Sequence, residues 1–316
     1  MPSTTAQTTF VCGATGTQGG ALASHLLSQG LPVHCLARNV ESPNAKSLIS
    51  RGARVWSGSY DDVPVLREAL SGCTTVFLNF NPQFHDLSTE LRWAQSILSI
   101  AKEAGASHAI FSSSLGSDDP LSVPGLKPNS FVFKVLESKN NIEKEVMSAK
   151  HLPKWTIFRP ANFMCNYILP NATFTCPDLI ATGTWRTPFT PSTRLALIDT
   201  ETMGKFTSAA VTNPDKFNGQ AITYADEIVS VVEMLETLKK VSGRQDLNIE
   251  FMSEEEVAEK VKVNIMVEGQ TLLRNMGPGA VNLEEVSKWG VELSSFDRFL
   301  EREKSRVIET YKRTAA

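Results

Sequence analysis

The sequence predicts an α/β fold in which a doubly wound parallel sheet carries helices on both faces. Short apolar runs alternate with helix-length segments from the N-terminus to about residue 160. Connections of that length are the crossovers that parallel strands require, because a tight turn cannot join two parallel neighbours. A glycine-rich turn also joins the first predicted strand to the first predicted helix.

The predicted elements follow one another in a regular order. The expected strands cover 8–12, 32–37, 53–57, 74–78, 108–111 and 155–158. The expected helices cover 18–29, 44–51, 64–70, 87–104 and 131–149. The fourth of these helices is followed by Gly105, the residue type that most often ends a helix.

The glycine-rich turn lies within residues 11–20, VCGATGTQGG. Gly13 permits a tight turn, Gly16 lets the backbone approach a pyrophosphate, and Gly19 lets the helix pack close to the strand. The start of the helix supplies amide donors and the positive end of the helix dipole. The turn therefore predicts a Rossmann-type dinucleotide site that also includes Thr15, Thr17 and Gln18.

The residues after the second predicted strand distinguish between cofactors. A carboxylate is expected there when NAD is bound, because it accepts a hydrogen bond from the ribose 2′-hydroxyl. This chain has Arg38 and Asn39 instead, and a guanidinium suits a 2′-phosphate. The sequence therefore predicts NADP(H), held in part by these two residues.

After residue 160 the alternation stops. Residues 162–194 are rich in proline, threonine and aromatic residues without a clean period, and we expect irregular loops over the carboxyl edge of the sheet. Helices are expected at 230–241, 254–268, 283–291 and 296–312. We expect an NADP(H)-binding domain over 1–160 and a smaller, mostly C-terminal α/β substrate lobe over 161–316, interleaved with the first domain.

Composition argues against several classes of protein. The formal net charge of −3 gives no electrostatic reason to expect nucleic acid or an anionic membrane as a partner. No apolar run reaches the roughly 18–20 residues that span a bilayer, and the N-terminus does not resemble a signal peptide. The five scattered cysteines form no CxxC pair, which predicts reduced thiols, no metal site and a cytoplasmic location.

Several further segments resemble the NmrA-like group of atypical short-chain dehydrogenases/reductases. The turn at 13–19 resembles the family's GATGxxG. Four more segments resemble motifs of the family. Residues 58–62 resemble its GDxxD segment, and residues 136–144 resemble its xxxSKxxIE segment. Residues 155–166 resemble its WTILRPxxFMEN segment, and residues 199–204 resemble its DxxDxG segment. Two positions depart from the pattern. Ser59 replaces the usual aspartate, and Val135 stands four residues before Lys139, so the YxxxK dyad of typical members of the superfamily is absent.

The resemblance implies where the cofactor lies. The GDxxD-like segment is expected to contact the adenine through Ser59 and Tyr60. The nicotinamide end is expected beside the mouth of the fourth strand and beside the sixth, at Asn79, Phe80, Asn81, Pro160, Ala161, Asn162 and Phe163.

The resemblance also implies catalytic candidates. Lys139 is expected to reach the nicotinamide ribose, and a lysine in this position transfers the proton in the related isoflavone-reductase-like enzymes, so both roles are open. Ser113 or Ser114 is expected to bond a substrate carbonyl oxygen, with a simple strand-end cap as the alternative. His85 is a candidate acid–base group, with a solvated loop histidine as the alternative.

Two functions are consistent with this pattern. The first is an NADPH-dependent oxidoreductase for a small aromatic or carbonyl-containing metabolite. Its apolar pocket would be formed by Phe163, Met164, Tyr167, Phe174, Trp185 and Phe189, with core or lid packing of these residues as the alternative. The second is a non-catalytic NADP(H)-sensing regulator that binds a protein partner, a class that the resemblance also includes. A homodimer is compatible with either. Lys139 and the serines favour the enzyme, and the missing tyrosine favours the regulator.

Overall fold

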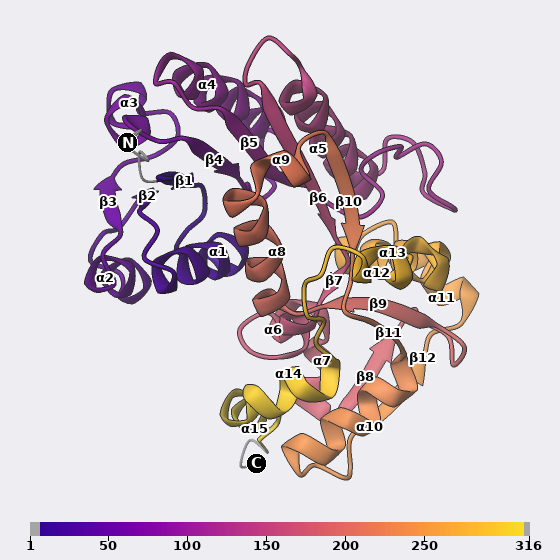
Figure 1. The fold of residues 1–316 in the computed structure, drawn as a ribbon. Helices are drawn as coiled ribbons and strands as arrows, with labels where there is room; N and C mark the ends of the chain where they lie inside the picture. Colours follow the sequence, from indigo (N-terminus) through magenta and orange to yellow (C-terminus); the bar gives the residue numbers. More distant parts are fainter. Residues whose placement is uncertain (1–6, 313–316) are drawn as a thin grey trace. The chain divides into compact units, whose positions relative to one another are not determined.

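A computed structural model describes residues 7–312, and the chain divides into two compact units (Figure 1). Among the described residues, the first unit contains 7–118, 134–159 and 203–222. The second contains 119–133, 160–202 and 223–312. The chain therefore passes between the units several times.

The first unit is built on a seven-stranded sheet with the order β10-β6-β5-β4-β1-β2-β3. All neighbouring pairs from β6 to β3 are parallel. The strands are β1 Thr9–Val11, β2 Val33–Ala37, β3 Arg54–Ser57, β4 Thr75–Leu78, β5 His108–Ser112, β6 Lys154–Pro160 and β10 Gln220–Tyr224. The predicted doubly wound parallel sheet is confirmed.

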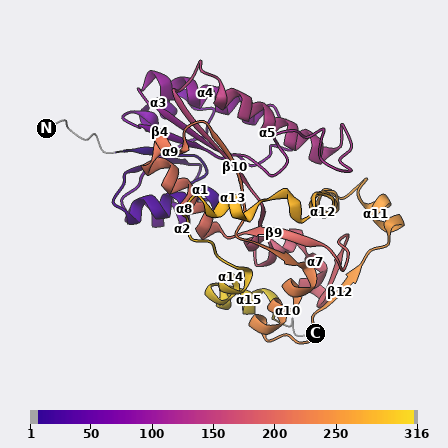
Figure 2. The ribbon, with the colours of Figure 1, turned by 45° about the vertical axis from the view of Figure 1, so that its right-hand side comes forward.

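Helices cover both faces of this sheet, as the crossover connections require. One face carries α1 Thr17–Ser28, α2 Pro43–Ser50 and α8 Thr200–Thr212, and α9 Pro214–Phe217 follows α8. The other face carries α3 Val63–Leu70, α4 Thr89–Glu103 and α5 Phe131–Met147, as Figures 1 and 2 show. Between sheet and helices lies a core of fully buried side chains that includes Phe10, Val76, Leu98 and Phe111.

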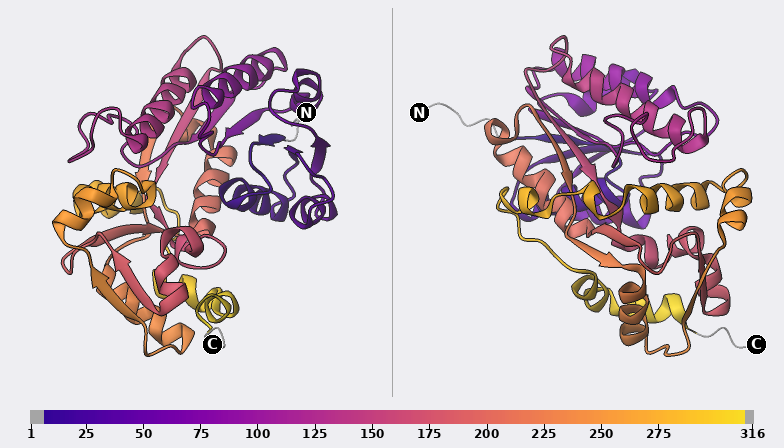
Figure 3. Two further views of the ribbon diagram at one scale, coloured as in Figure 1. Left: turned by 180° about the vertical axis from the view of Figure 1, so that it is seen from behind. Right: turned by 90° about the vertical axis from the view of Figure 1, so that its right-hand side faces the viewer.

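The second unit contains two small sheets. Strands β7 Asn162–Phe163, β9 Arg194–Ile198 and β11 Glu227–Ser230 form one, and β8 Thr184–Thr187 pairs in parallel with β12 Asn248–Phe251. Figure 3 shows the helical segments of this unit from two further sides. They are η1 Met164–Tyr167, α6 Ala172–Thr175, α7 Pro177–Thr182, α10 Val231–Ser242, α11 Glu254–Lys260, α12 Ile265–Met276, η2 Pro278–Ala280, α13 Leu283–Ser287, α14 Phe296–Arg302 and α15 Lys304–Tyr311.

Three sequence predictions for this unit are wrong. Residues 162–194 form short strands and helices, each of seven residues or fewer, which leave too little length for a period to show. The helix predicted at 254–268 is interrupted, because the side chain of Asn264 accepts hydrogen bonds from Met266 N and Val267 N and starts α12. The helix predicted at 296–312 is divided at Glu303.

Three general properties of the described residues limit the kinds of site to consider. Within residues 7–312, no helix is both long and apolar enough to cross a membrane. No group of three or more His, Cys, Asp or Glu side chains in the same range could hold a metal ion. The five cysteines are buried free thiols, and burial raises the pKa of Cys12 and Cys35 to about 12.

Candidate functional site

The carboxyl ends of β1, β2 and β4 lie side by side, because β1 pairs in parallel with both neighbours. Gly13 follows β1 closely, Arg38 follows β2, and Asn79 follows β4. The glycine-rich turn, the basic residue and the polar end of β4 therefore meet at one edge of the sheet within the first unit. Ligands of doubly wound sheets bind at such an edge.

The glycines of the turn have different structural roles. Gly13 has a φ of +65°, in the left-handed region that favours glycine, and its carbonyl accepts a hydrogen bond from Gly16 N at 2.9 Å. A Cβ on Gly19 would lie 2.4 Å from Gly13 O and 2.5 Å from Cys12 O, so this glycine allows α1 to pack against the turn. A Cβ on exposed Gly16 would approach only Gly13 O, at 3.3 Å, among the described atoms.

The start of α1 is suited to an anion. Gly16 is its N-cap residue and has no side chain to accept a hydrogen bond from the first turn. Several other helices are capped, since Ser42, Asp62 and Ser230 accept backbone N–H bonds at the starts of α2, α3 and α10, whereas α4 and α7, like α1, begin without a side-chain cap. The free amides at the start of α1 and the open backbone at Gly16 fit the pyrophosphate of a dinucleotide.

Arg38 and Asn39 lie exposed beside this turn. The guanidinium of Arg38 makes no hydrogen bond or ion pair with any residue in 7–312. Asn39 Oδ1 accepts a hydrogen bond from Glu41 N at 2.9 Å. Asn44 Nδ2 donates to Thr15 O at 2.8 Å and joins the start of α2 to the glycine-rich turn.

Tyr60 supports the turn from behind. Its hydroxyl accepts a hydrogen bond from Gly13 N at 2.8 Å, and its ring packs edge-on against Phe80 and Trp93. Burial raises the pKa of Tyr60 well above the usual value. The structure thus places the Tyr60 hydroxyl at the turn, while Ser59 lies exposed next to it.

A polar bridge runs from α1 to β4 and β5. Gln18 Nε2 donates to Asn79 Oδ1 at 3.2 Å, and Ser112 Oγ donates to Gln18 Oε1 at 2.5 Å. These bonds fix the side chain of Gln18 between two strand ends. Asn81, two residues beyond Asn79, is exposed, and Thr17 is exposed at the start of α1.

Lys139 is buried on α5 and paired with a residue that the sequence reasoning missed. Its Nζ donates to Glu90 Oε2 on α4 and to the carbonyl oxygen of Phe80, each at 2.7 Å. Lys139 is 5% exposed and Glu90 is not exposed at all. Burial lowers the pKa of Lys139, and the carboxylate of Glu90 opposes that shift. The only sequence signal for Glu90 was a charged residue on the inner side of an amphipathic helix.

The two candidate serines differ in their surroundings. Ser113 is buried and its Oγ lies 2.8 Å from Ser117 Oγ, which donates to Glu143 Oε1 at 2.6 Å. Ser114 is partly exposed, and its hydroxyl makes no hydrogen bond with the described residues. His85 lies exposed in the segment between β4 and α4.

The predicted residues at the end of β6 and directly after it belong to the second unit. Pro160 and Ala161 are buried, and Ala161 N donates to Tyr224 O at 3.0 Å. Asn162 Nδ2 donates to the Tyr167 hydroxyl at 2.8 Å, and Phe163 forms β7 together with Asn162.

The prediction that six apolar residues of this segment wall a pocket is wrong. Met164, Tyr167, Trp185 and Phe189 are at most 1% exposed and pack against one another in the core of the second unit, where Phe163 also packs. Phe174 is instead 70% exposed on the surface. Aromatic residues at this density satisfy a small lobe's need for a core.

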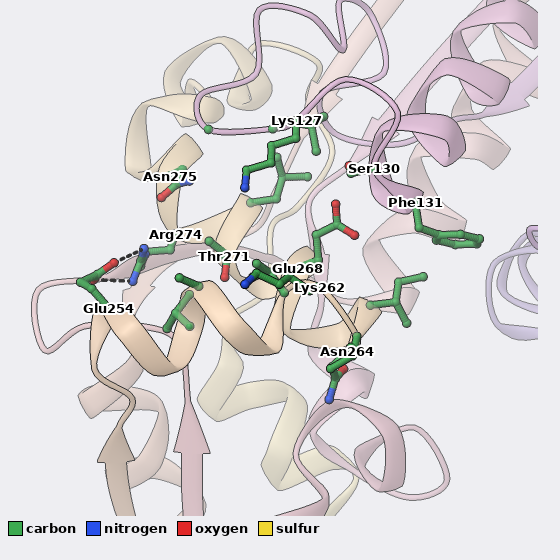
Figure 4. Close-up of a pocket in the computed structure, with 18 of the residues that line it drawn as sticks. Lys127, Ser130, Phe131, Glu254, Lys262, Asn264, Glu268, Thr271, Arg274 and Asn275 are labelled. Atoms are coloured by element: carbon green, nitrogen blue, oxygen red, sulfur yellow. Dashed lines mark hydrogen bonds and ion pairs between the residues drawn. The ribbon is translucent and has the colours of Figure 1, made fainter.

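The second unit does contain a pocket at another place, between the loop at 125–131 and helices α11 and α12 (Figure 4). It has a volume of about 690 Å³. Its walls are apolar with several charged side chains among them, and Phe131 is its single aromatic lining residue.

Comparison with known proteins places the chain in a family. Residues 5–298 match the family model described as the NmrA-like family. The chain belongs to this family. An NmrA-like family domain-containing protein of Dictyostelium discoideum is 26% identical over 75% of this chain and 78% of its own length. The NmrA-like family domain-containing oxidoreductase hkm9 of Aspergillus hancockii is 26% identical over 78% of this chain and 75% of its own length.

Solved structures share the NmrA-like fold at low sequence identity. The negative transcriptional regulator NmrA in complex with NADP superposes with a TM-score of 0.71 at 18% identity, covering 97% of this chain and 98% of that one. The Citrobacter triphenylmethane reductase complexed with NADP(H) gives a TM-score of 0.69 at 18% identity, covering 93% and 99%.

Proposed function

We propose that the protein is an NADP(H)-dependent oxidoreductase that acts on a small aromatic or carbonyl-containing metabolite such as a quinone or an enone. The observation that carries the proposal is the exposed, unpartnered Arg38 beside the uncapped start of α1. The oxidoreductases among its relatives and the NADP-bound structures of similar fold support it.

The cofactor would be held by residues of the first unit. The backbone from Gly13 to Gly19 binds the pyrophosphate, and Arg38 binds the 2′-phosphate. Ser59, next to the turn, contacts the adenine. Bound NADPH supplies the hydride of the reduction. The segment Asn79 to Asn81 lines the nicotinamide end.

Ser114 and Lys139 have separate proposed roles. The free hydroxyl of Ser114 donates a hydrogen bond to the substrate oxygen, where negative charge develops during reduction. Lys139 holds the Phe80 carbonyl and thereby fixes the segment that follows β4. Because its Nζ is buried and donates to both Glu90 and the Phe80 carbonyl, we assign Lys139 a positioning role in place of proton transfer. Exposed His85 is the proposed proton donor.

Cofactor selectivity tests the binding half of the proposal. Isothermal titration calorimetry is expected to show tighter binding of NADPH than of NADH. Arg38→Asp should reduce or reverse that preference by roughly ten- to a hundred-fold, the usual value of a charge-assisted contact. Arg51→Asp, in the same unit after α2, is the control and should leave the preference unchanged. Equal affinity of the unmutated protein for both cofactors would contradict the assignment of Arg38.

Turnover tests the catalytic half. A screen of quinones, enones and aromatic ketones is expected to find a compound that oxidises NADPH in the presence of the protein. The reaction is measured as the loss of NADPH absorbance. Ser114→Ala should then lower kcat by about a hundred- to a thousand-fold while leaving NADPH affinity unchanged, and Ser113→Ala, at a buried position, should lower kcat less. Tight NADPH binding with no turnover in a broad screen would exclude the proposed activity.

A further inference from the structure

The pocket of the second unit is held open by a loop fixed at both ends. At one end Asn275 Nδ2 donates to Pro124 O at 3.3 Å, and at the other Val132 N donates to Glu268 Oε2 at 3.4 Å. Gly125 has a φ of +73°, and a Cβ there would lie 2.5 Å from Asn275 Nδ2. This glycine thus allows the loop to lie directly against the end of α12. The loop spans the helices between these contacts and leaves a space beneath it.

The walls of this space are suited to an apolar molecule. Its floor includes Val257 and Leu272, which are 4% and 8% exposed. Further apolar lining comes from Leu126, Phe131, Val261 and Ile265. The volume of about 690 Å³ lies within the range of about 300–1,000 Å³ that small-molecule sites occupy.

Of the charged side chains that line the pocket, all but two form ion pairs with other described residues. Arg274 Nη1 and Nη2 bind both carboxylate oxygens of Glu254, at 3.0 and 3.3 Å. Lys262 pairs with Glu259 at 2.6 Å. Lys127 has no ion pair with any residue that the structure describes, and Glu268 accepts only the long bond from Val132 N.

Lys127 and Glu268 approach the space from opposite walls. In Figure 4, Lys127 extends from the loop and Glu268 rises from α12 into the same space, and no ion pair joins them. An anion alone would leave Glu268 without a cationic partner, and a cation alone would leave Lys127 without an anionic one. A ligand that carries both charges satisfies both side chains.

We propose that this pocket binds a small zwitterion with an apolar body, of which a dipeptide of two apolar residues is the simplest example. Lys127 binds the carboxylate of the ligand and Glu268 binds its ammonium group. The aliphatic walls cover the apolar side chains of the ligand. This proposal concerns binding in the second unit and is independent of NADPH oxidation.

Calorimetric titration of the full-length protein with L-leucyl-L-phenylalanine, without cofactor, tests the proposal. The free dipeptide is expected to bind, and its N-acetylated and C-amidated forms should each bind roughly three- to five-fold more weakly, as expected for a partly exposed ion pair. Lys127→Ala should abolish the difference between the free and amidated dipeptides. Glu268→Gln, which retains an acceptor for Val132 N, should abolish the difference between the free and acetylated ones.

The matched controls are Lys288→Ala and Glu285→Gln, an exposed ion pair of the same unit that does not line the pocket. Both should bind all three forms like the parent protein. Thermal melting of Lys127→Ala and Glu268→Gln should confirm that each variant is folded. Absence of dipeptide binding at millimolar concentration, equal binding of free and blocked forms, or unchanged discrimination in the two pocket variants would overturn the proposal.

Discussion

The charge of Lys139 is held in a nearly dry part of the first unit by one carboxylate and one carbonyl oxygen. Its place in the sequence predicts that this lysine faces the ligand. The structure shows that it also joins α5 to α4 and to the end of β4. One oxygen of its partner, Glu90 Oε1, is buried without a hydrogen bond among the described residues, so this pair is incompletely satisfied.

Substitution of either partner of this pair should destabilise the protein more than substitution of both. Lys139→Met leaves the buried Glu90 carboxylate uncompensated, and we expect a loss of about 3 kcal/mol in the free energy of unfolding. The double variant Lys139→Met/Glu90→Leu should recover most of this loss, because it removes both charges. Urea denaturation of the parent protein, the two single variants and the double variant gives the four free energies of unfolding of this double-mutant cycle. Additive losses in the double variant would show that the two residues are not energetically coupled.

A larger side chain at two glycines of the turn should affect two different properties, cofactor binding at Gly16 and stability at Gly19. Gly16→Val should weaken NADPH binding by at least about a hundred-fold while the protein remains folded, because the side chain takes the place that the pyrophosphate requires. Gly19→Ala should instead lower the free energy of unfolding by about 1–3 kcal/mol, since its Cβ would press on the backbone of Gly13 and Cys12. Calorimetry and urea denaturation separate the two effects. Near-normal NADPH affinity in Gly16→Val would show that the site is elsewhere.

Helix packing explains the glycine at the end of the DxxDxG-like segment. Gly204 lies in α8, and a Cβ on it would be 2.4 Å from His25 Cδ2 and 2.9 Å from Ala21 O of α1. The absence of a side chain therefore allows these two helices to pack closely on one face of the sheet. A few residues earlier, Asp199 is fully buried and binds Arg302 of α14 through both of its oxygens, at 2.6 and 2.7 Å. This segment thus makes contacts in both units through different residues.

The effect of alanine should have opposite signs in two helices. Gly204→Ala is expected to lower the free energy of unfolding by about 1–3 kcal/mol, because the new methyl group meets α1. Gly269→Ala, in α12 with no described atom within 4 Å of the added Cβ, is the matched control. It should raise stability by up to about 1 kcal/mol through helix propensity. Stabilisation by Gly204→Ala would contradict the close packing of α1 and α8.

The whole molecule should lose stability in mild acid through a buried histidine. His108 in β5 is 1% exposed, and its Nε2 lies 2.9 Å from Thr156 Oγ1, which itself donates to Phe217 O. Thr156 therefore accepts from His108, and the other ring nitrogen has no partner among the described residues. Burial, with a smaller contribution from Lys154, lowers the pKa of His108 from 6.5 to about 4.

The lowered pKa of His108 determines how the free energy of unfolding changes with pH. The unfolded chain binds the proton more tightly than the folded protein, so the stabilisation is complete above about pH 6.5 and is lost as the pH falls towards 4. Between about pH 7.5 and 4.5 we expect the parent protein to lose about 2.5 kcal/mol more than His108→Gln. Urea denaturation across this range measures the difference, with the exposed His85→Gln as the control. Parallel pH profiles for the parent protein and His108→Gln would contradict this account.

The sequence by itself determined the order of strands and helices up to residue 160, the position of the glycine-rich turn and the family. These features are local: a periodic pattern or a turn lies within a few residues and is visible without the fold. The tertiary structure decided which side chains meet. Lys139 and Glu90 are 49 positions apart, Gly13 and Tyr60 are 47 apart, and the pocket joins the loop at 125–131 to helices beyond residue 253. Contacts between residues so far apart depend on how the elements pack, so no local pattern could distinguish the aromatic core around Trp185 from a pocket.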